Sequence, residues 1–128
     1  MKDFRTEKLA GILQHSKRDW VKTGGSLVCK VLGDVRAKAC IASSWCSNQL
    51  DCIDVTLVRP SLGVIDKERF LFKDYFADKR CSQNAPLWST FLDESGKWNF
   101  EQYTWCLPTK QDFKSIAEAI DLYLDMMI

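Results

Sequence analysis

Histidine, cysteine and carboxylate side chains are the groups in this chain that could do chemistry. The single histidine, His15, lies among polar neighbours in a segment that we expect to be helical. It could serve as the base for a cysteine or serine nucleophile, but no residue has the Gly-x-Ser-x-Gly context of a nucleophile elbow. We therefore expect a solvated histidine, and we predict that the chain has no catalytic residue.

The six cysteines could bind a metal or form disulfides. They are Cys29, Cys40, Cys46, Cys52, Cys81 and Cys106. No pair has the Cys-x-x-Cys spacing of a zinc site, and one histidine adds little to a ligand set. The charged N-terminal residues also lack the apolar segment of a secretory signal. We expect reduced cysteines that fill the core of a cytoplasmic protein, with no structural metal and no cofactor.

Two pairs of carboxylates are close in sequence. Asp51 and Asp54 flank the start of a predicted strand, and Asp93 and Glu94 lie in a predicted turn. Paired carboxylates can perform acid–base chemistry or bind a cation. Aspartate is also common at turns and strand ends for its local hydrogen bonds, and we prefer that interpretation here.

The composition limits the possible partners. The chain has 128 residues, enough for one domain with its own core, and its 18 basic and 17 acidic residues give a net charge of about +1. Such a balance lacks the broad positive footprint of a protein that binds nucleic acid or a membrane surface. No apolar run is long enough to span a bilayer. We expect neither nucleic acid nor a membrane as a partner.

The first half of the chain predicts a helix followed by strands. Helical spacing of apolar residues indicates a helix over 4–18 that Asp3 can cap and that Gly24-Gly25 ends. Strands are expected over 27–32, 35–41 and 52–59, with Gly33-Asp34 as a two-residue hairpin turn between the first two. In the second strand Arg36 and Lys38 form a basic stripe opposite an apolar face.

The second half predicts a longer antiparallel meander. Residues 64–76 fit either a strand or a capped helix, and we favour a strand over 69–75. Residues 77–86 form a polar loop. Aromatic residues then predict a hairpin of strands over 86–92 and 97–107.

The last segment predicts an amphipathic helix. Thr109 is suited to its N-cap, and Asp112 completes a pair like a capping box. Its apolar positions fall on one broad face, formed by Phe113, Ile116, Ala117, Ile120, Tyr123, Leu124 and Met127. The whole chain, residues 1–128, therefore predicts a single α+β domain: an antiparallel sheet of five or six strands flanked by an N-terminal and a C-terminal helix.

Tryptophan is abundant, with five residues in the chain. Most of them can fill the layer between sheet and helices. Trp45, in a polar loop, and Trp98, next to a predicted turn, are the candidates for an exposed binding surface, where tryptophan often anchors a partner.

The outline resembles that of small bacterial immunity proteins, which neutralise polymorphic or contact-dependent growth-inhibition toxins. The resemblance covers the layout: the first helix with Leu9-Ala10-Gly11-Ile12-Leu13, the strand entry Gly24-Gly25-Ser26-Leu27, the Trp98-Asn99-Phe100 strand and the Pro108-Thr109 capped helix. It includes no diagnostic motif and transfers no binding residue.

The resemblance implies a cytosolic protein that inhibits a cognate toxin domain by covering its active site or an exosite. Inhibitors of basic toxins are often acidic, and this near-neutral chain would need a local acidic cluster. Asp51, Asp54, Asp93, Glu94 and Glu101 could form it if their loops converge. The alternative is a small ligand-binding or accessory module with a pocket between sheet and helix, and an enzyme is a third hypothesis.

Overall fold

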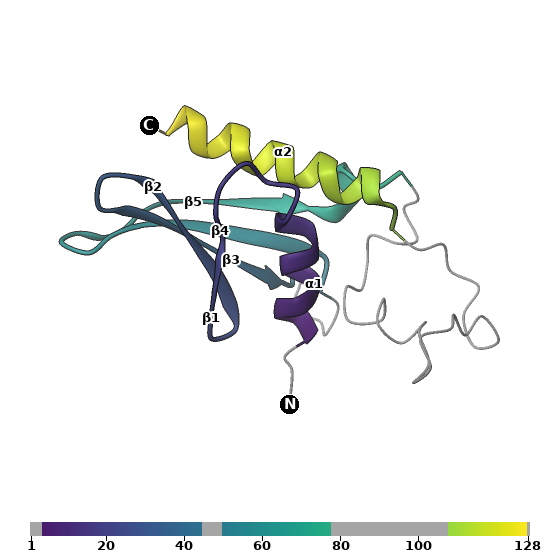
Figure 1. Cartoon of the computed structure of the whole chain (residues 1–128), viewed down its shortest axis with the longest axis horizontal. Coiled ribbons are helices and arrows are strands. Elements are labelled where there is room, and N and C mark those ends of the chain that lie inside the picture. The colour runs from purple at the N-terminus through teal and green to yellow at the C-terminus, as the bar shows by residue number, and fades with distance from the viewer. Residues whose placement is uncertain (1–3, 45–49, 78–107, 128) are drawn as a thin grey trace.

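The computed structural model describes residues 4–44, 50–77 and 108–127. Its elements are α1 (Phe4–Leu13), β1 (Val21–Thr23), β2 (Ser26–Leu32), β3 (Val35–Ala42), β4 (Cys52–Arg59), β5 (Gly63–Leu71), the 3-10 helix η1 (Phe72–Asp74) and α2 (Lys110–Met126). Within this part of the chain the strands form one antiparallel sheet in the order β1-β2-β3-β4-β5 (Figure 1). The predicted α+β class, an antiparallel sheet with an N-terminal and a C-terminal helix, is confirmed.

Two glycine turns fix the register at the start of the sheet. Gly24 has φ +61° between Thr23 and Ser26, and Gly33 has φ +60° between Leu32 and Val35. Both angles are in the left-handed region, which glycine enters without the steric penalty of a Cβ. The predicted Gly33-Asp34 hairpin is therefore present. Gly24-Gly25 closes a second hairpin, between β1 and β2. The sequence did not predict β1, because three residues are too few to show an alternating pattern.

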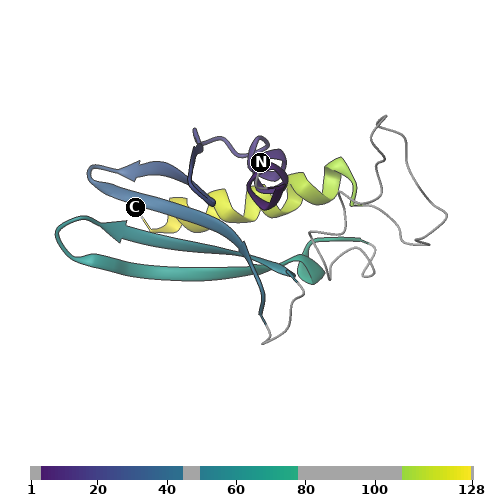
Figure 2. The same cartoon turned by 90° about the horizontal axis from the view of Figure 1, so that it is seen from below.

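Both helices cover the same face of the sheet (Figures 1 and 2). Alternate residues of β2, β3 and β4 point to them and are buried; in β3 these are Val35, Ala37, Ala39 and Ile41, as its pattern predicts. They pack against Leu9 and Ile12 of α1 and against α2 in one hydrophobic core. Since successive residues of a strand point to opposite faces, the other half of each strand faces away from the helices.

Helix α2 starts and packs as its sequence predicts. The Thr109 side chain accepts a hydrogen bond from the Asp112 N–H (3.1 Å), and the Asp112 carboxylate accepts one from the Thr109 N–H (2.9 Å). The same carboxylate accepts a bond from the Ala77 N–H (3.1 Å), which ties the segment after η1 to the helix. Ile116, Ile120 and Leu124 are fully buried, and each contributes about 1.5–3 kcal/mol before entropy is subtracted.

Helix α1 is shorter than predicted, because it ends at Leu13 and not at residue 18. The Ser16 hydroxyl donates to Asp121 of α2 (2.5 Å) and accepts from the Trp20 Nε1–H (2.9 Å). These tertiary hydrogen bonds take the chain off the helical path, so the helical spacing of Ser16 and Trp20 was misleading.

The segment that fitted strand or helix is a strand, but its predicted bounds were wrong. β5 spans Gly63–Leu71 and pairs along the whole of β4, and the chain then turns into η1 at Phe72. The hydrogen-bonded pairing with β4 therefore outweighs the local sequence features that also fitted a helix. Met127 was also placed wrongly, since it caps the C-terminus of α2 and is 45% exposed.

Some predictions lie outside the described residues. They include the Asp3 cap, most of the polar loop over 77–86, and the aromatic hairpin with strands over 86–92 and 97–107.

The capping box gives a direct test of the α2 assignment. Thr109→Ala removes one side of the box and should lower the free energy of unfolding by about 1 kcal/mol. Ser115→Ala is the matched control, since the Ser115 hydroxyl bonds only back to the Gln111 carbonyl (2.9 Å) and amide within the helix. Urea unfolding followed by circular dichroism measures both, and equal effects would contradict the assignment.

Candidate functional site

The strands of the sheet have one face that points away from α1 and α2 (Figures 1 and 2), and we call it the open face. Cys52, at one end of this face, is buried, whereas the side chains nearer its centre are exposed or half-buried. They are Val28, Lys30, Arg36, Lys38, Cys40, Asp54, Thr56, Val58, Val64, Lys67 and Arg69. Five are cations and one is an acid, so this face holds an excess positive charge of four that the net charge of +1 conceals.

Strand pairing arranges these side chains in rows across the sheet. One row joins Cys40, Asp54 and Arg69, and the next joins Lys38, Thr56 and Lys67. Lys38 and Lys67 therefore lie on either side of Thr56. Neither lysine makes an ion pair with any residue that the structure describes.

The acid of the open face is already neutralised. Asp54 receives two hydrogen bonds from Arg69, one from Nε (2.7 Å) and one from Nη2 (3.1 Å). This two-point geometry is the strong form of an arginine–carboxylate pair. Its hydrogen bonds and charge raise the pKa of the Arg69 guanidinium further above its ordinary value. Asp54 thus fixes Arg69 and leaves the neighbouring lysines uncompensated.

The third row brings two like charges together. Lys30 of β2 lies directly opposite Arg36 of β3, and among the described residues the row continues with Val58 and Val64 and holds no carboxylate. Arg36 donates from Nη1 to the backbone oxygens of Gly33 (3.0 Å) and Val35 (3.2 Å), which are neutral acceptors. Like charges directly opposite each other destabilise a sheet by roughly 0.2–1 kcal/mol.

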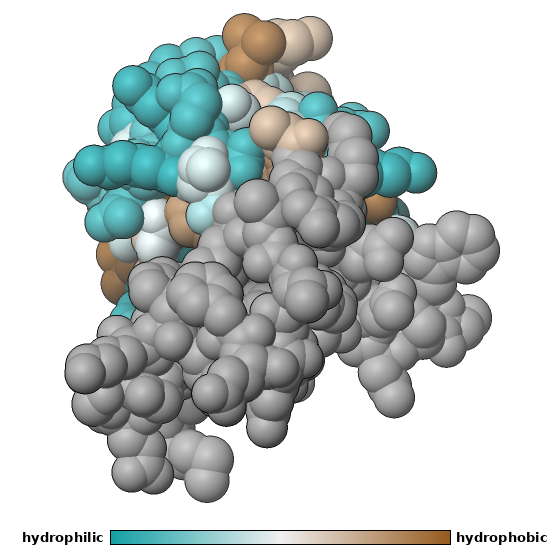
Figure 3. Space-filling view, turned by 90° about the vertical axis from the view of Figure 1, so that its right-hand side faces the viewer, coloured by the Kyte–Doolittle hydropathy of each residue, from teal (hydrophilic) through white to brown (hydrophobic). Residues whose placement is uncertain are grey.

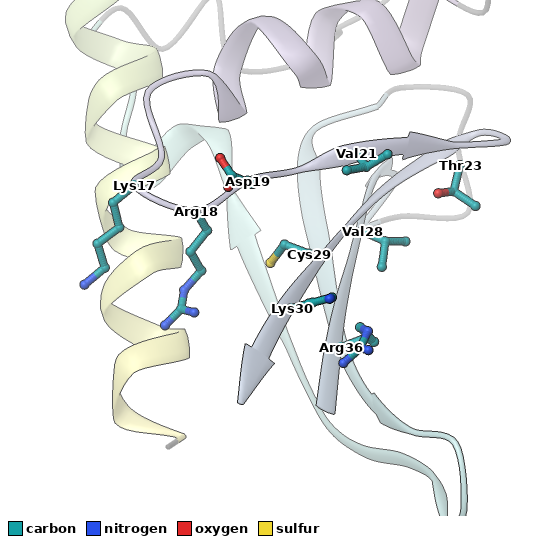
Figure 4. A pocket seen from close by; sticks show the side chains of 9 residues that line it. All are labelled: Lys17, Arg18, Asp19, Val21, Thr23, Val28, Cys29, Lys30 and Arg36. Carbon is teal, nitrogen blue, oxygen red and sulfur yellow. The ribbon is translucent and has the colours of Figure 1, made fainter. Parts of the chain in front are cut away.

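A hollow of about 570 Å³ adjoins this pair (Figure 4). It opens because β1 pairs only as far as Val28, while β2 continues to Leu32. Figure 4 shows Lys30 and Arg36 on the strands at one side of the hollow and Lys17 and Arg18 beside α2 at the other. Val21 and Val28 add apolar surface and Asp19 adds a carboxylate, so the hollow combines four cations and one acid with an apolar wall.

A second hollow, of about 510 Å³, lies at the other end of the open face. Its lining includes Asp54, Thr56, Lys67 and Arg69. The open face therefore has two hollows, one beside Lys30 and Arg36 and one beside Asp54 and Arg69.

The connection between α1 and β1 is fastened to α2. Asp121, only 8% exposed, accepts hydrogen bonds from the Ser16 hydroxyl (2.5 Å) and the Lys17 N–H (2.9 Å). Asp125, one turn later, pairs with Lys17 and with Arg18 Nη2 (2.8 Å). These contacts position the cations at one side of the larger hollow.

Exposed apolar side chains are spread over the described surface, on the strands and turns as well as on α2. Leu122, Met126 and Met127 are exposed near its C-terminal end. Figure 3 shows a mainly hydrophilic surface over the described residues, with apolar atoms at the top, the side on which Figure 1 places α2. Scattered apolar residues of this kind are normal on a protein surface.

The described thiols are free and protonated at neutral pH. Cys29 and Cys52 are buried, and Cys40 is half-buried. Burial raises the pKa of Cys29 to about 11 and that of Cys52 to about 12, and nearby Asp54 acts in the same direction on Cys52. Since the thiolate is the nucleophile, these sites are poor nucleophiles.

The predicted acidic cluster is not assembled by its two described members. Asp51 accepts hydrogen bonds from the Ser44 N–H (2.8 Å) and hydroxyl in the loop before β4, while Asp54 pairs with Arg69 on the open face. Asp51 thus has the local role that the turn interpretation predicted. Trp45, Asp93, Glu94, Trp98 and Glu101 lie outside the described residues.

The sequence analysis found part of the open face and missed the rest. It identified Arg36 and Lys38 as a basic stripe, but it did not connect them with Lys30, Lys67 and Arg69. The missing signal was the alternation of Lys67 and Arg69 with Asp66 and Glu68, which places the two cations on one face of a strand. The alternation indicates a shared face only if residues 63–71 are already known to form a strand.

Other kinds of site are not seen in the described part of the chain. It contains no group of three His, Cys, Asp or Glu side chains that could hold a metal ion. None of its helices has the length and apolar character needed to cross a membrane. His15 follows α1, is half-buried, and its N–H donates to the Ile12 carbonyl (3.2 Å).

Comparison with protein-family models, with curated proteins and with solved structures finds no match to this chain.

Asp121 should contribute far more to stability than Asp125. Asp121→Ala leaves the half-buried Ser16 hydroxyl and the Lys17 N–H without their acceptor, and should lower the free energy of unfolding by about 1–3 kcal/mol. Asp125→Ala removes ion pairs at an exposed carboxylate, which solvent screens, so its effect should be much smaller. Urea unfolding of the two variants tests this, and a larger loss for Asp125→Ala would contradict the described packing.

Cys29 and Cys52 should resist alkylation in the folded protein. With raised pKa values both remain thiols near pH 7.5, and folding stability linked to them should be present below pH 9 and fall as pH rises through about 11 to 12. Mass mapping after iodoacetamide treatment, with and without urea, measures the protection. Equal labelling of either thiol in the folded and unfolded protein would refute it.

Proposed function

We propose that this chain is a protein-binding inhibitor that uses the open face as its docking surface. Its most specific form is a cytosolic immunity protein that neutralises a cognate bacterial toxin domain by covering the active site or an exosite. The observation that carries the proposal is a sheet face four strands wide, exposed to solvent and held by helices on its opposite side.

The scaffold suits a binding role. Strands β2 to β5 are joined by continuous ladders, and the core behind them is packed by both helices. Side chains on such a sheet keep their relative positions, so little conformational entropy is lost on docking. The buried thiols of Cys29 and Cys52, with their raised pKa values, also fit a binding role better than that of cysteine nucleophiles.

The nature of the partner rests on the resemblance of layout to immunity proteins. That resemblance includes α1, the Gly24-Gly25 strand entry and the capped α2, all present among the described residues. The structure changes one expectation, because the described surface offers cations and not the acidic cluster of Asp51 and Asp54. The toxin domain would then present acidic groups.

A second candidate, binding of a small ligand, is favoured by a hollow of about 340 Å³ between α1 and the β1–β2 hairpin. Its lining includes Leu13 and Gln14 of α1, Trp20 of the connection, and Lys22 and Leu27 of the hairpin. The volume is at the lower end of the range for ligand sites. Thermal stabilisation by a metabolite, abolished by Gln14→Trp, would support this function.

Co-expression tests the inhibitor proposal. The chain should restore growth of cells that produce the toxin domain encoded beside its gene, and the two proteins should purify as a complex. Replacing Lys38 and Lys67 together by Glu should abolish protection while circular dichroism shows a folded protein, because both side chains are exposed and unpaired among the described residues. Absence of both protection and complex for the native chain would end the proposal.

A further inference from the structure

We infer that the open face binds an acidic protein surface, and that the Lys30–Arg36 pair beside the 570 Å³ hollow is the seat of a carboxylate side chain of that partner. This inference names the chemistry of the partner and rests on the proposed function for the partner's identity.

The first argument is the unbalanced charge of the pair. Lys30 and Arg36 are direct cross-strand neighbours, and the described residues of their row are otherwise valines. A folded protein gains nothing from placing these charges opposite each other, since the contact is repulsive in the free state. Asp19 lines the same hollow but forms no ion pair with either cation among the described residues. A conflict of this kind, in a row without a described carboxylate, is typical of a functional site. A carboxylate from outside would relieve the repulsion and accept hydrogen bonds from both side chains.

The second argument is the geometry around the pair. Arg36 is held at the β2–β3 turn by hydrogen bonds from Nη1 to two backbone oxygens, and within the described residues its Nε and Nη2 donors make no hydrogen bond. The adjoining hollow has apolar wall from Val21, which is 63% exposed, and from Val28. A carboxylate on an aliphatic stem, as in glutamate, matches cations at the rim and apolar surface inside.

The third argument separates a protein from a nucleic acid. Single-stranded nucleic acid is held by a basic groove together with aromatic side chains on which bases stack. The described residues of the open face include valines, a threonine and a cysteine, and no aromatic ring. Asp54 also lies among the cations, where a continuous phosphate backbone would meet it. A protein surface that mixes acidic and apolar groups fits the open face better than a nucleic acid does.

The test uses an octaglutamate peptide and an eight-residue oligothymidine of similar charge as probes of the full chain. Backbone amide resonances of Lys30, Arg36 and Lys38 should shift with the peptide, and the shifts should decrease as salt rises. Lys30→Glu should weaken peptide affinity roughly tenfold, because one attraction becomes a repulsion. Lys114→Glu, an exposed lysine of α2, is the matched control and should change affinity less than about twofold.

Stability supplies a second readout. Lys30→Glu turns the like-charge pair with Arg36 into an opposite-charge pair, so it should raise the urea midpoint by roughly 0.2–0.5 M while binding is lost. Lys30→Gln should fall between the native chain and Lys30→Glu in both measurements. A variant that is more stable and yet binds less cannot be explained by misfolding.

The outcomes separate the inference from the proposed function. If Lys30→Glu and Lys114→Glu weaken the peptide equally, or the oligothymidine shifts the same residues at lower concentration, the inference is overturned. If the toxin domain binds Lys30→Glu as tightly as the native chain, the inference falls and the proposed function stands. If the peptide binds as expected and no toxin domain does, the proposed function falls and the chemistry of the surface stands.

Discussion

The packing of α2 against one face of the sheet is the interaction on which the rest of the structure depends. Ile116, Ile120 and Leu124 are fully buried there. Hydrogen bonds at the edge of this contact orient the helix: Tyr123 donates to Asp66 of β5, and Asp121 accepts from the α1–β1 connection. Burial and the bond to Asp66 raise the pKa of the Tyr123 hydroxyl, so it remains a donor. Because both helices pack against this face, neither helix covers the open face of the sheet.

The charges of the open face follow from that arrangement. A strand that is buried on one face only can place polar residues at every second position, and β2 and β3 use those positions for cations. β5, which is exposed over most of its length, adds Lys67 and Arg69 to the same face. Asp54 balances Arg69, while Lys30 opposes Arg36 in a row that holds no acid among the described residues. The open face thus contains one neutralised ion pair, Asp54–Arg69, and one pair of like charges, Lys30–Arg36. A carboxylate of a partner can neutralise the second pair.

Sequence reasoning succeeded where structure is local and failed where distant residues decide it. The capping box of α2, the Gly33-Asp34 turn and the bounds of β4 over 52–59 were all predicted, since each is encoded within a few residues. The end of α1 depends on Ser16 and Asp121, which are 105 positions apart. The faces of β5 depend on its register with β4. The site could be seen only in part for the same reason, because Lys30 and Lys67 join the Arg36–Lys38 stripe through pairing alone.

Zero-length cross-linking of a complex with the toxin domain measures the central claim most directly. Carbodiimide joins an amine to a carboxylate only when the two are in contact, and mass spectrometry identifies the joined residues. The account predicts cross-links from Lys30, Lys38 and Lys67 to aspartate or glutamate of the toxin domain. Cross-links confined to Lys110 and Lys114 of α2, with the three sheet lysines free, would contradict it.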